Sequence, residues 1–260
     1  MTAKICFTMD NLSDAADLGR GVIDKPRPAG QRPALDQGFP AMLDLYDRYG
    51  VKVTHFLEGW NGEAHPDIVE DLVNMGHSVG MHGWQHEAWS ELSLEQEIEL
   101  MGRSTDALHQ ASGIKPTAFR APGGKRTANT LKLLTEFGYS IDSSLNDQGE
   151  DGGEIQALTE TLWHVPHLEA TIDARQWLQK SIPAKEVELS WLKVLEQTRE
   201  KNGFLLFIWH PHVMGVNADY LKVGESILHS VSQEKEFEIV TLQELVAEKM
   251  AEQTTEQAKV

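Results

Sequence analysis

Five side chains that can move protons or bind metals stand at, or just after, the ends of short apolar runs. They are Asp10, His82, His86, Arg120 and His210. Short apolar runs predict buried β-strands. In an α/β barrel the C-terminal ends of the strands, with the residues that follow them, lie on one face and build the active site. We therefore expect these five side chains to meet in one pocket.

Two of the five have the spacing of a metal site. His82 and His86 lie four residues apart just past a predicted strand, and on a turn or the first turn of a helix both imidazoles can face one point. A bare pair of histidines at this spacing is more often two unrelated loop residues. A metal site therefore needs a third, oxygen ligand, for which Asn11 and Asp14 are the candidates. A catalytic site would also leave one position open for water.

The other three, Asp10, His210 and Arg120, have the properties of a general base, a general acid and a cation that keeps the base ionised. A nearby cation such as Arg120 favours the ionised form of Asp10, which a general base requires. His210 directly follows the apolar run 204–209, and the pKa of an imidazole suits it to protonate a departing amine. Taken alone, His210 fits a structural histidine equally well. His167, at the end of another predicted strand, is the alternative acid.

Short apolar runs alternate with amphipathic stretches, which is typical of βα units around a parallel sheet. The predicted strands are Lys4–Met9, Val51–Glu58, Ser78–Met81, Thr117–Ala121, Tyr139–Asp142, Leu162–Val165, Phe204–Trp209 and Phe237–Val240. The predicted helices are Gly38–Tyr49, Pro66–Met75, Ser93–Ser112, Ala128–Phe137, Ala184–Asn202, Tyr220–Gln233 and Leu242–Ala251. Two polar, Gly-rich stretches, Asn11–Gln37 and Asn146–Thr159, are predicted to be long loops. Loops of this length in a compact domain are usually functional.

Length and charge narrow the class of protein. The chain has 260 residues and a formal net charge of −17, with a mass of 29.1 kDa and a pI near 5.0. We expect one domain over residues 1–260, with its core in about 4–245 and a frayed tail over 252–260. The negative charge argues against nucleic acid or an anionic membrane as a partner.

The remaining compositional signals concern compartment and cofactors. Cys6 is the only cysteine, which excludes an internal disulfide and a cysteine-based zinc cluster. We see no signal-peptide pattern and no apolar stretch approaching the roughly 18 residues of a membrane span. The expected compartment is the cytoplasm. The sequence leaves the oligomeric state open, a homo-oligomer included.

Taken in order, four motifs resemble those of the polysaccharide deacetylase family, also called the NodB-homology family. Thr8-Met9-Asp10-Asn11 resembles its first motif, usually Thr-Phe-Asp-Asp, and the segment from His82 to His86 matches its H-x-x-x-H motif. Arg120-Ala121-Pro122-Gly123 resembles its R-x-P motif, and Leu206 to Pro211 its hydrophobic-His-Pro motif. The resemblance runs from about Lys4 to Leu245 and implies an α/β fold, an irregular (β/α) barrel of seven or eight parallel strands.

The resemblance also implies roles for single residues. Asp10 would be the general base, His210 the general acid, and Arg120 the residue that orients Asp10. His82 and His86 would hold a divalent metal, zinc or cobalt. The family's second aspartate, the carboxylate ligand, is Asn11 here, and an amide oxygen binds zinc more weakly than a carboxylate does. Asp14 is the alternative ligand, and a site that works without metal also stays open.

Three functions are compatible with this pattern. The first is a hydrolase of non-peptide carbon–nitrogen bonds in carbohydrate metabolism, which removes the acetyl group from an N-acetylated amino sugar or polysaccharide with the help of a metal. The second is hydrolysis of a small cyclic amide, imide or ureide, which the lack of a signal-peptide pattern and the pair Asp10-Asn11 favour. The segments His210-Pro211-His212 and Asp142-Ser143-Ser144 resemble the branch that holds both peptidoglycan deacetylase-like proteins and allantoinases. The third is a non-catalytic carbohydrate-binding descendant, since fold alone does not give function. A full set of base, acid and histidine pair speaks against it.

Overall fold

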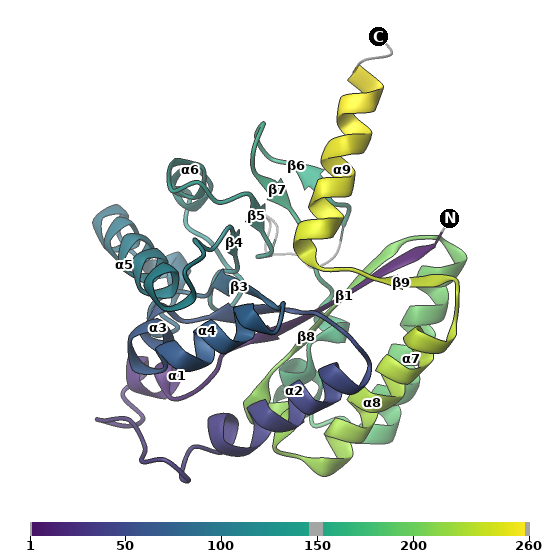
Figure 1. Cartoon of the computed structure of the whole chain (residues 1–260), viewed down its shortest axis with the longest axis horizontal. Helices are drawn as coiled ribbons and strands as arrows, with labels where there is room; N and C mark the ends of the chain where they lie inside the picture. Colours follow the sequence, from purple (N-terminus) through teal and green to yellow (C-terminus); the bar gives the residue numbers. More distant parts are fainter. Residues whose placement is uncertain (1, 146–152, 258–260) are drawn as a thin grey trace.

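A curled, mostly parallel sheet forms the centre of the protein, as a computed structural model shows for residues 2–145 and 153–257 (Figure 1). In the described residues the sheet has nine strands in the order β6-β7-β5-β4-β3-β2-β1-β8, with β9 paired to β1. All neighbouring strands run parallel except β6 and β7. The strands are β1 Ala3–Asp10, β2 Thr54–Leu57, β3 Ser78–Met81, β4 Ala118–Phe119, β5 Ile141–Asp142, β6 Gln156–Ala157, β7 Trp163–His164, β8 Phe204–Trp209 and β9 Phe237–Ile239.

Helices cover the outside of this sheet (Figure 1). The α-helices are α1 Ala15–Gly19, α2 Phe39–Arg48, α3 Gly59–Ala64, α4 Pro66–Asn74, α5 Leu94–Ser112, α6 Thr130–Glu136, α7 Ala184–Glu200, α8 Ala218–Gln233 and α9 Leu242–Gln257. Shorter helical turns are η1 Ala34–Gly38, η2 Trp89–Glu91, η3 Glu169–Thr171, η4 Arg175–Gln179 and η5 Pro211–Gly215.

The continuous apolar run of β8, which ends the strand order beside β1, reflects burial along nearly its whole length. Leu205 to Trp209 are all buried, as expected for a parallel strand covered on both faces. β8 pairs with β1 along six residues, from Lys4 opposite Phe204 to Met9 opposite Trp209. Ile172 forms an isolated parallel bridge with Ile208 of β8, so a further piece of extended chain lies against that strand. The predicted fold class, an irregular (β/α) barrel, is confirmed.

The eight predicted strands are all present, and two of them, β3 and β8, have the predicted bounds. β4, β5 and β7 have only two residues each. For β4 one physical reason is that the backbone N–H of Ala121 donates to the side chain of Ser144 instead of to a neighbouring strand. β6 falls in the predicted loop Asn146–Thr159, of which 146–152 lie outside the described residues.

Two helices were not predicted. α1 lies in the stretch Asn11–Gln37, which was predicted to be a loop throughout. α3 contains Gly59 and Gly62, and glycine disfavours helices. Their small size is required because α3 packs closely on α5: a Cβ atom on Gly59 would lie 2.5 Å from the Cα atom of Ser104, and one on Gly62 would lie 2.6 Å from the carbonyl oxygen of Ala107.

Helix ends follow sequence signals more closely. Ser93 accepts a hydrogen bond from the backbone of Gln96, whose side chain accepts one from the backbone of Ser93. This capping box starts α5 at the predicted place. Helix α9 continues to Gln257, past its predicted end at Ala251 and into the tail predicted to fray, and it projects from the body (Figure 1). Residues 258–260 lie outside the described part.

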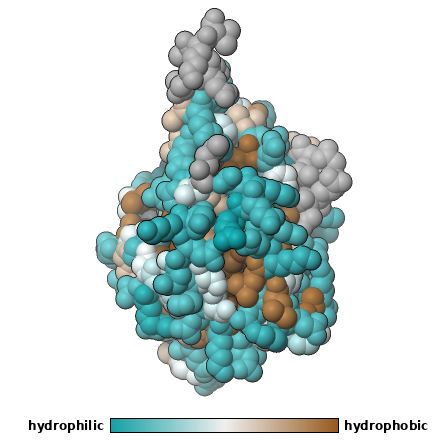
Figure 2. Space-filling view, turned by 90° about the vertical axis from the view of Figure 1, so that its right-hand side faces the viewer, coloured by the Kyte–Doolittle hydropathy of each residue, from teal (hydrophilic) through white to brown (hydrophobic). Residues whose placement is uncertain are grey.

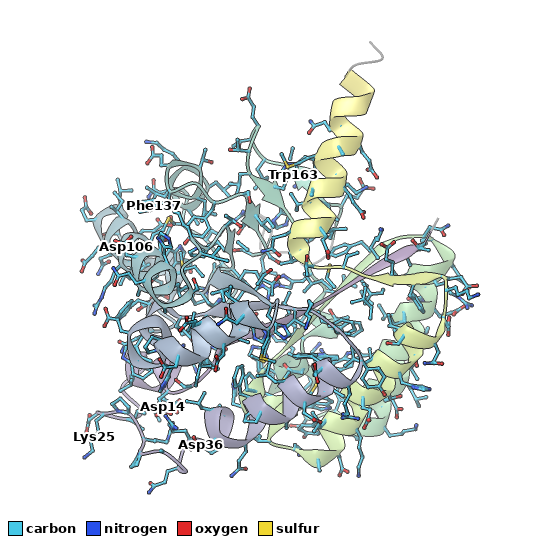
Figure 3. The ribbon with its side chains drawn as sticks, in the orientation of Figure 1. Asp14, Lys25, Asp36, Asp106, Phe137 and Trp163 are labelled. Atoms are coloured by element: carbon cyan, nitrogen blue, oxygen red, sulfur yellow. The ribbon has the colours of Figure 1, made fainter. Side chains whose placement is uncertain are left out.

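The side that carries α7, α8 and β9 is mostly hydrophilic, with hydrophobic side chains gathered near its middle (Figure 2). The segment between β1 and α2, with Asp14, Lys25 and Asp36, runs along one end of the molecule (Figure 3). Among the described residues, no helix has the length and apolar character needed to span a membrane.

Candidate active site

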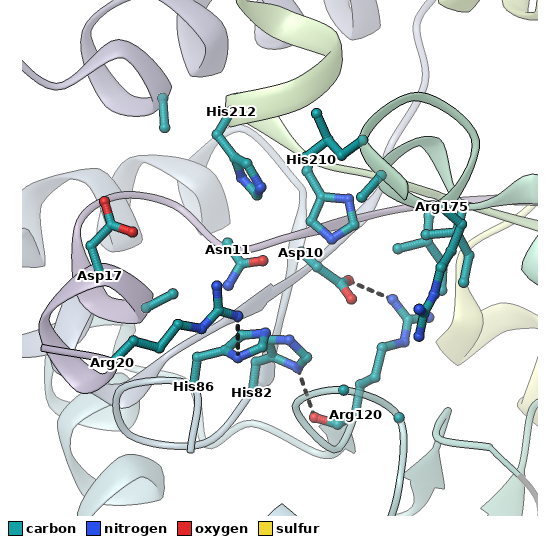
Figure 4. A pocket seen from close by; sticks show the side chains of 18 of the residues that line it. Asp10, Asn11, Asp17, Arg20, His82, His86, Arg120, Arg175, His210 and His212 are labelled. Carbon is teal, nitrogen blue, oxygen red and sulfur yellow. Dashed lines mark hydrogen bonds and ion pairs between the residues drawn. The ribbon is translucent and has the colours of Figure 1, made fainter. Parts of the chain in front are cut away.

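A pocket of about 890 Å³ lies at the C-terminal ends of the strands and collects all five reactive side chains. Asp10 is the last residue of β1, and His82, Arg120 and His210 directly follow β3, β4 and β8. His86 lies on the turn after His82. Figure 4 shows these side chains turned toward one another. The expected convergence is confirmed. Its cause is that parallel strands place their C-terminal ends at one edge of the sheet.

Asp10 is held as an anion by Arg120. The Nη1 atom of Arg120 donates to Oδ1 of Asp10 over 2.5 Å, and both side chains are buried. Arg120 is itself fixed by hydrogen bonds to Thr8 and to Ser143. Burial alone would raise the pKa of Asp10, but the positive charge of Arg120, with smaller contributions from His82 and His210, places it below its ordinary value. Asp10 is therefore a carboxylate at neutral pH.

His210 has a carboxylate partner that the sequence interpretation missed. Asp173 accepts a hydrogen bond from Nδ1 of His210 over 2.6 Å and one from its backbone N–H over 2.8 Å. Burial alone would lower the pKa of His210, but Asp173, which is fully buried, outweighs this, and the pKa lies above its ordinary value. One signal was available: Thr171-Ile172-Asp173 is a β-branched pair followed by an acid. A run of only two residues is too short to predict a strand.

The two histidines of the H-x-x-x-H motif carry their protons on opposite ring nitrogens. Nδ1 of His82 lies 2.8 Å from the carbonyl oxygen of Arg120, which can only accept, so His82 is protonated on Nδ1 and presents a lone pair on Nε2. Nδ1 of His86 lies 3.2 Å from Nη2 of Arg20, which can only donate, so neutral His86 is protonated on Nε2. The two ring centroids are 4.9 Å apart.

Burial keeps both histidines neutral. Desolvation lowers the pKa of His82 to about 4, and desolvation together with the charges of His82 and Arg20 lowers that of His86 to about 3. The alternative acid, His167, also lines the pocket, and burial lowers its pKa to about 4. His167 is thus neutral where His210 is protonated, which makes His210 the better proton donor.

Asn11 is turned by a buried carboxylate that was also missed. The side-chain amide of Asn11 donates to Oε1 of Glu58, and Asn61 donates to Oε2 over 2.7 Å. Burial raises the pKa of Glu58 to about 7, and the hydrogen bond from Asn11 opposes that rise. Because the amide nitrogen is engaged by Glu58, the Oδ1 atom of Asn11 is left for the pocket. Glu58 directly follows β2, so the rule that selected Asp10 could have selected it.

Two pocket residues have an unusual backbone. Asn11 has φ of 66° and His86 has φ of 63°, in the left-handed region that side chains other than glycine rarely adopt. The turn around His86 is held by Glu87, whose carboxylate accepts hydrogen bonds from the backbone N–H groups of Trp84 and Gln85 over 2.9 and 2.8 Å. Backbone strain of this kind often accompanies functional sites.

Asp14 lies in the same pocket, but both of its carboxylate oxygens accept hydrogen bonds from Arg27. Its Oδ1 accepts from the guanidinium of Arg27 over 2.5 Å, and its Oδ2 accepts from the backbone N–H of Arg27 over 2.7 Å. The structure thus favours Asn11 over Asp14 as the oxygen donor beside the histidine pair.

The donor set fits a divalent metal under one condition. The described residues contain no cluster of three or more His, Cys, Asp or Glu side chains that could hold a metal, and the third donor is the amide of Asn11. His82 has the arrangement usual for a metal-binding histidine, with Nδ1–H on a carbonyl and Nε2 free. Asn11 presents its oxygen. His86 becomes a ligand only if its hydrogen bond with Arg20 is broken, since a ring nitrogen that accepts a hydrogen bond has no lone pair to spare.

The polysaccharide deacetylase family model matches residues 29–141 of the chain. The resemblance to this family is confirmed. The matched segment contains His82, His86 and Arg120, whereas Asp10 and His210 lie on either side of it. The parallel pairing of β1 with β8 brings those two residues to the same edge of the sheet.

One relative in sequence and two solved structures are similar to the chain. The peptidoglycan deacetylase of Helicobacter pylori is 26% identical over 156 residues, which are 60% of this chain and 52% of that protein. The chain thus spans about half the length of that relative. A solved Mycobacterium smegmatis structure assigned to the polysaccharide deacetylases has 23% identity and a TM-score of 0.82, covering 97% of this chain and 92% of its own. The Puue allantoinase structure has 15% identity and a TM-score of 0.76, covering 94% and 89%. These two likenesses show the fold.

Proposed function

We propose that the protein hydrolyses the amide bond of an N-acetylated amino sugar, in a saccharide or polysaccharide. The observation that carries this proposal is the pairing of a buried base with an acid across one pocket. Asp10 is kept ionised by Arg120, and His210 is kept protonated by Asp173. The family match to polysaccharide deacetylases and the similarity to a peptidoglycan deacetylase support the sugar substrate.

The base step uses the free oxygen of Asp10. Its Oδ1 atom is engaged by Arg120, which leaves Oδ2 to take a proton from a water molecule as that water attacks the acyl carbon. Arg120 cannot accept this proton, because a guanidinium is already fully protonated. The guanidinium therefore fixes the direction of the carboxylate and keeps it charged until the attack.

The acid step uses the opposite side of the imidazole of His210. Its Nδ1–H donates to Asp173, so the second proton of the charged ring lies on Nε2. This Nε2–H is available to the nitrogen that leaves the acyl group. A departing amine that takes up a proton is a far better leaving group than an amide anion, which is why the reaction needs an acid.

The metal dependence is also part of the proposal. His82, His86 and Asn11 would hold a divalent metal, zinc or cobalt, once Arg20 has left His86. When bound, such a metal supplies a Lewis acid for the acyl carbonyl and the attacking water. Two of these three ligands would be oriented by buried partners: Asn11 by Glu58, and His82 by the carbonyl of Arg120.

A release assay tests the function. Purified protein, with and without added Zn²⁺ or Co²⁺, is incubated with N-acetylglucosamine oligomers, peptidoglycan fragments and, as a separate class, cyclic imides and ureides. We expect acetate from the N-acetylated sugars and a loss of roughly 10²–10⁴-fold in rate for Asp10→Asn.

The matched control is Asp36→Asn, because Asp36 also pairs with an arginine, Arg32, but lies outside the pocket. It should leave the rate unchanged. Hydrolysis of the cyclic compounds alone would replace the sugar with a cyclic amide as substrate. Absence of hydrolysis on both classes, in folded protein with metal, would contradict the proposed function.

A further inference from the structure

Arg20 donates a hydrogen bond to His86, one of the three residues that would hold a metal. Its Nη2 atom lies 3.2 Å from Nδ1 of His86, and the two side chains meet in Figure 4. A guanidinium has only donors, so this contact requires the lone pair of Nδ1 and places the single proton of neutral His86 on Nε2. Neither ring nitrogen then has a lone pair for a metal.

The position of Arg20 is fixed by the fold. Arg20 caps the C-terminal end of α1, with its backbone N–H bonded to the carbonyl of Ala16. The preceding residue, Gly19, packs on the turn that carries His86: a Cβ atom there would lie 2.2 Å from the carbonyl oxygen of Gln85. Only glycine permits this approach. The contact therefore sets Arg20 beside His86.

The charge of Arg20 is not neutralised by a carboxylate in the described part of the chain. The nearby acids Asp14 and Asp17 both pair with Arg27 instead. A divalent cation at His86 would thus meet an uncompensated positive charge as well as an occupied ring nitrogen. Both effects disfavour metal binding as long as Arg20 keeps this contact.

We propose that Arg20 and a divalent metal compete for His86, so that Arg20 sets the affinity of the site for metal. The proposal rests on the metal site described above. Metal binding requires Arg20 to swing away, which either frees Nδ1 for the metal or lets the proton move from Nε2 to Nδ1 so that Nε2 can bind. Arg20 is thereby a positioning residue, which acts through His86.

Metal titration tests the competition. Chelator-treated protein is titrated with Co²⁺, followed by absorbance, and with Zn²⁺ in competition. Arg20→Met, which removes the donor and the charge, should bind both metals about 10–100-fold more tightly than the parent, the range in which partners of metal ligands act. Arg20→Lys, which keeps a donor and the charge, should stay close to the parent.

The matched control is Arg175→Met. Arg175 lines the same pocket but bonds to Gln179, so its removal changes the pocket charge without freeing His86. Its metal affinity should stay within about threefold of the parent. Equal affinity in the parent and Arg20→Met, or an equal gain in Arg175→Met, would overturn the proposal. So would an absence of metal binding in all four proteins.

Nitrogen NMR of the imidazoles gives a readout independent of metal and of activity. In the metal-free parent, His86 should be protonated on Nε2 and His82 on Nδ1, and Arg20→Met should abolish the preference in His86 alone. A proton on Nδ1 of His86 in the parent would overturn the proposal. Amide hydrolysis with unchanged metal affinity in Arg20→Met would refute the competition and leave the proposed function intact, whereas altered affinity without hydrolysis would do the reverse.

Discussion

The two halves of the pocket are built differently. In the acid–base half, Asp10 and His210 each have a buried partner of opposite charge, Arg120 or Asp173. In the metal half, Asn11 bonds through a neutral amide to Glu58, and His86 bonds to Arg20, a side chain exposed to solvent. Asn11 and His86 also have left-handed backbones.

The two halves differ in whether their side chains are already in the state that the proposed reaction needs. Charged partners within a buried site hold the proton-transfer groups in their working states before any substrate arrives. In the other half, the proposed metal would have to replace another cation, the guanidinium of Arg20. The acid–base half should therefore show large kinetic effects on mutation, and the metal half smaller effects on affinity.

The largest effect is expected for the acid. His210→Ala should remove the falling alkaline limb of the pH–rate profile and slow hydrolysis roughly 10²–10⁴-fold. The loss should be smaller for an activated ester of the same acyl group, whose leaving group needs no proton. His212→Ala is the control, because His212 lines the same pocket and forms no ion pair with a carboxylate in the described residues. Equal losses on amide and ester would assign the acid to another residue.

A smaller effect is expected for the partner of the acid. Asp173 raises the pKa of His210, so the protonated ring persists to higher pH in the parent. Asp173→Asn should lower that pKa, move the alkaline limb of kcat/KM to lower pH and reduce the maximal rate roughly tenfold to hundredfold. The acidic limb, set by Asp10, should stay in place. If the alkaline limb does not move in Asp173→Asn, then Asp173 does not set the pKa of the group that donates the proton.

The smallest effect is expected in the metal half. Asn11→Asp adds charge to the ligand but turns a carboxylate toward Glu58, which would then have to keep a proton. Metal affinity should rise modestly in this variant and by roughly tenfold in Asn11→Asp with Glu58→Gln, where an amide donor again faces a carboxylate. Calorimetric titration with Zn²⁺ measures both. An affinity that is unchanged or weaker in both variants would show that position 11 is not a ligand.

The strand segments along the chain and the edge that carries the site were predictable because both follow from local patterns. Apolar runs such as 204–209 are typical of strands buried on both faces, and parallel strands have their C-terminal ends at the same edge of the sheet. The partners Asp173, Glu58 and Arg20 were not predicted. Each meets its target across a long stretch of chain, as Asp173 does with His210, 37 residues away.

The sequence by itself determined which side chains could act as base, acid and ligands, and that these would lie at the ends of parallel strands. Spacing along the chain and the run of apolar residues carry that information. Only the tertiary structure decided the state of each group, because ionisation and tautomer depend on what lies within hydrogen-bond distance. Arg120 favours the anion of Asp10, Asp173 raises the pKa of His210, and Arg20 donates to the Nδ1 lone pair of His86.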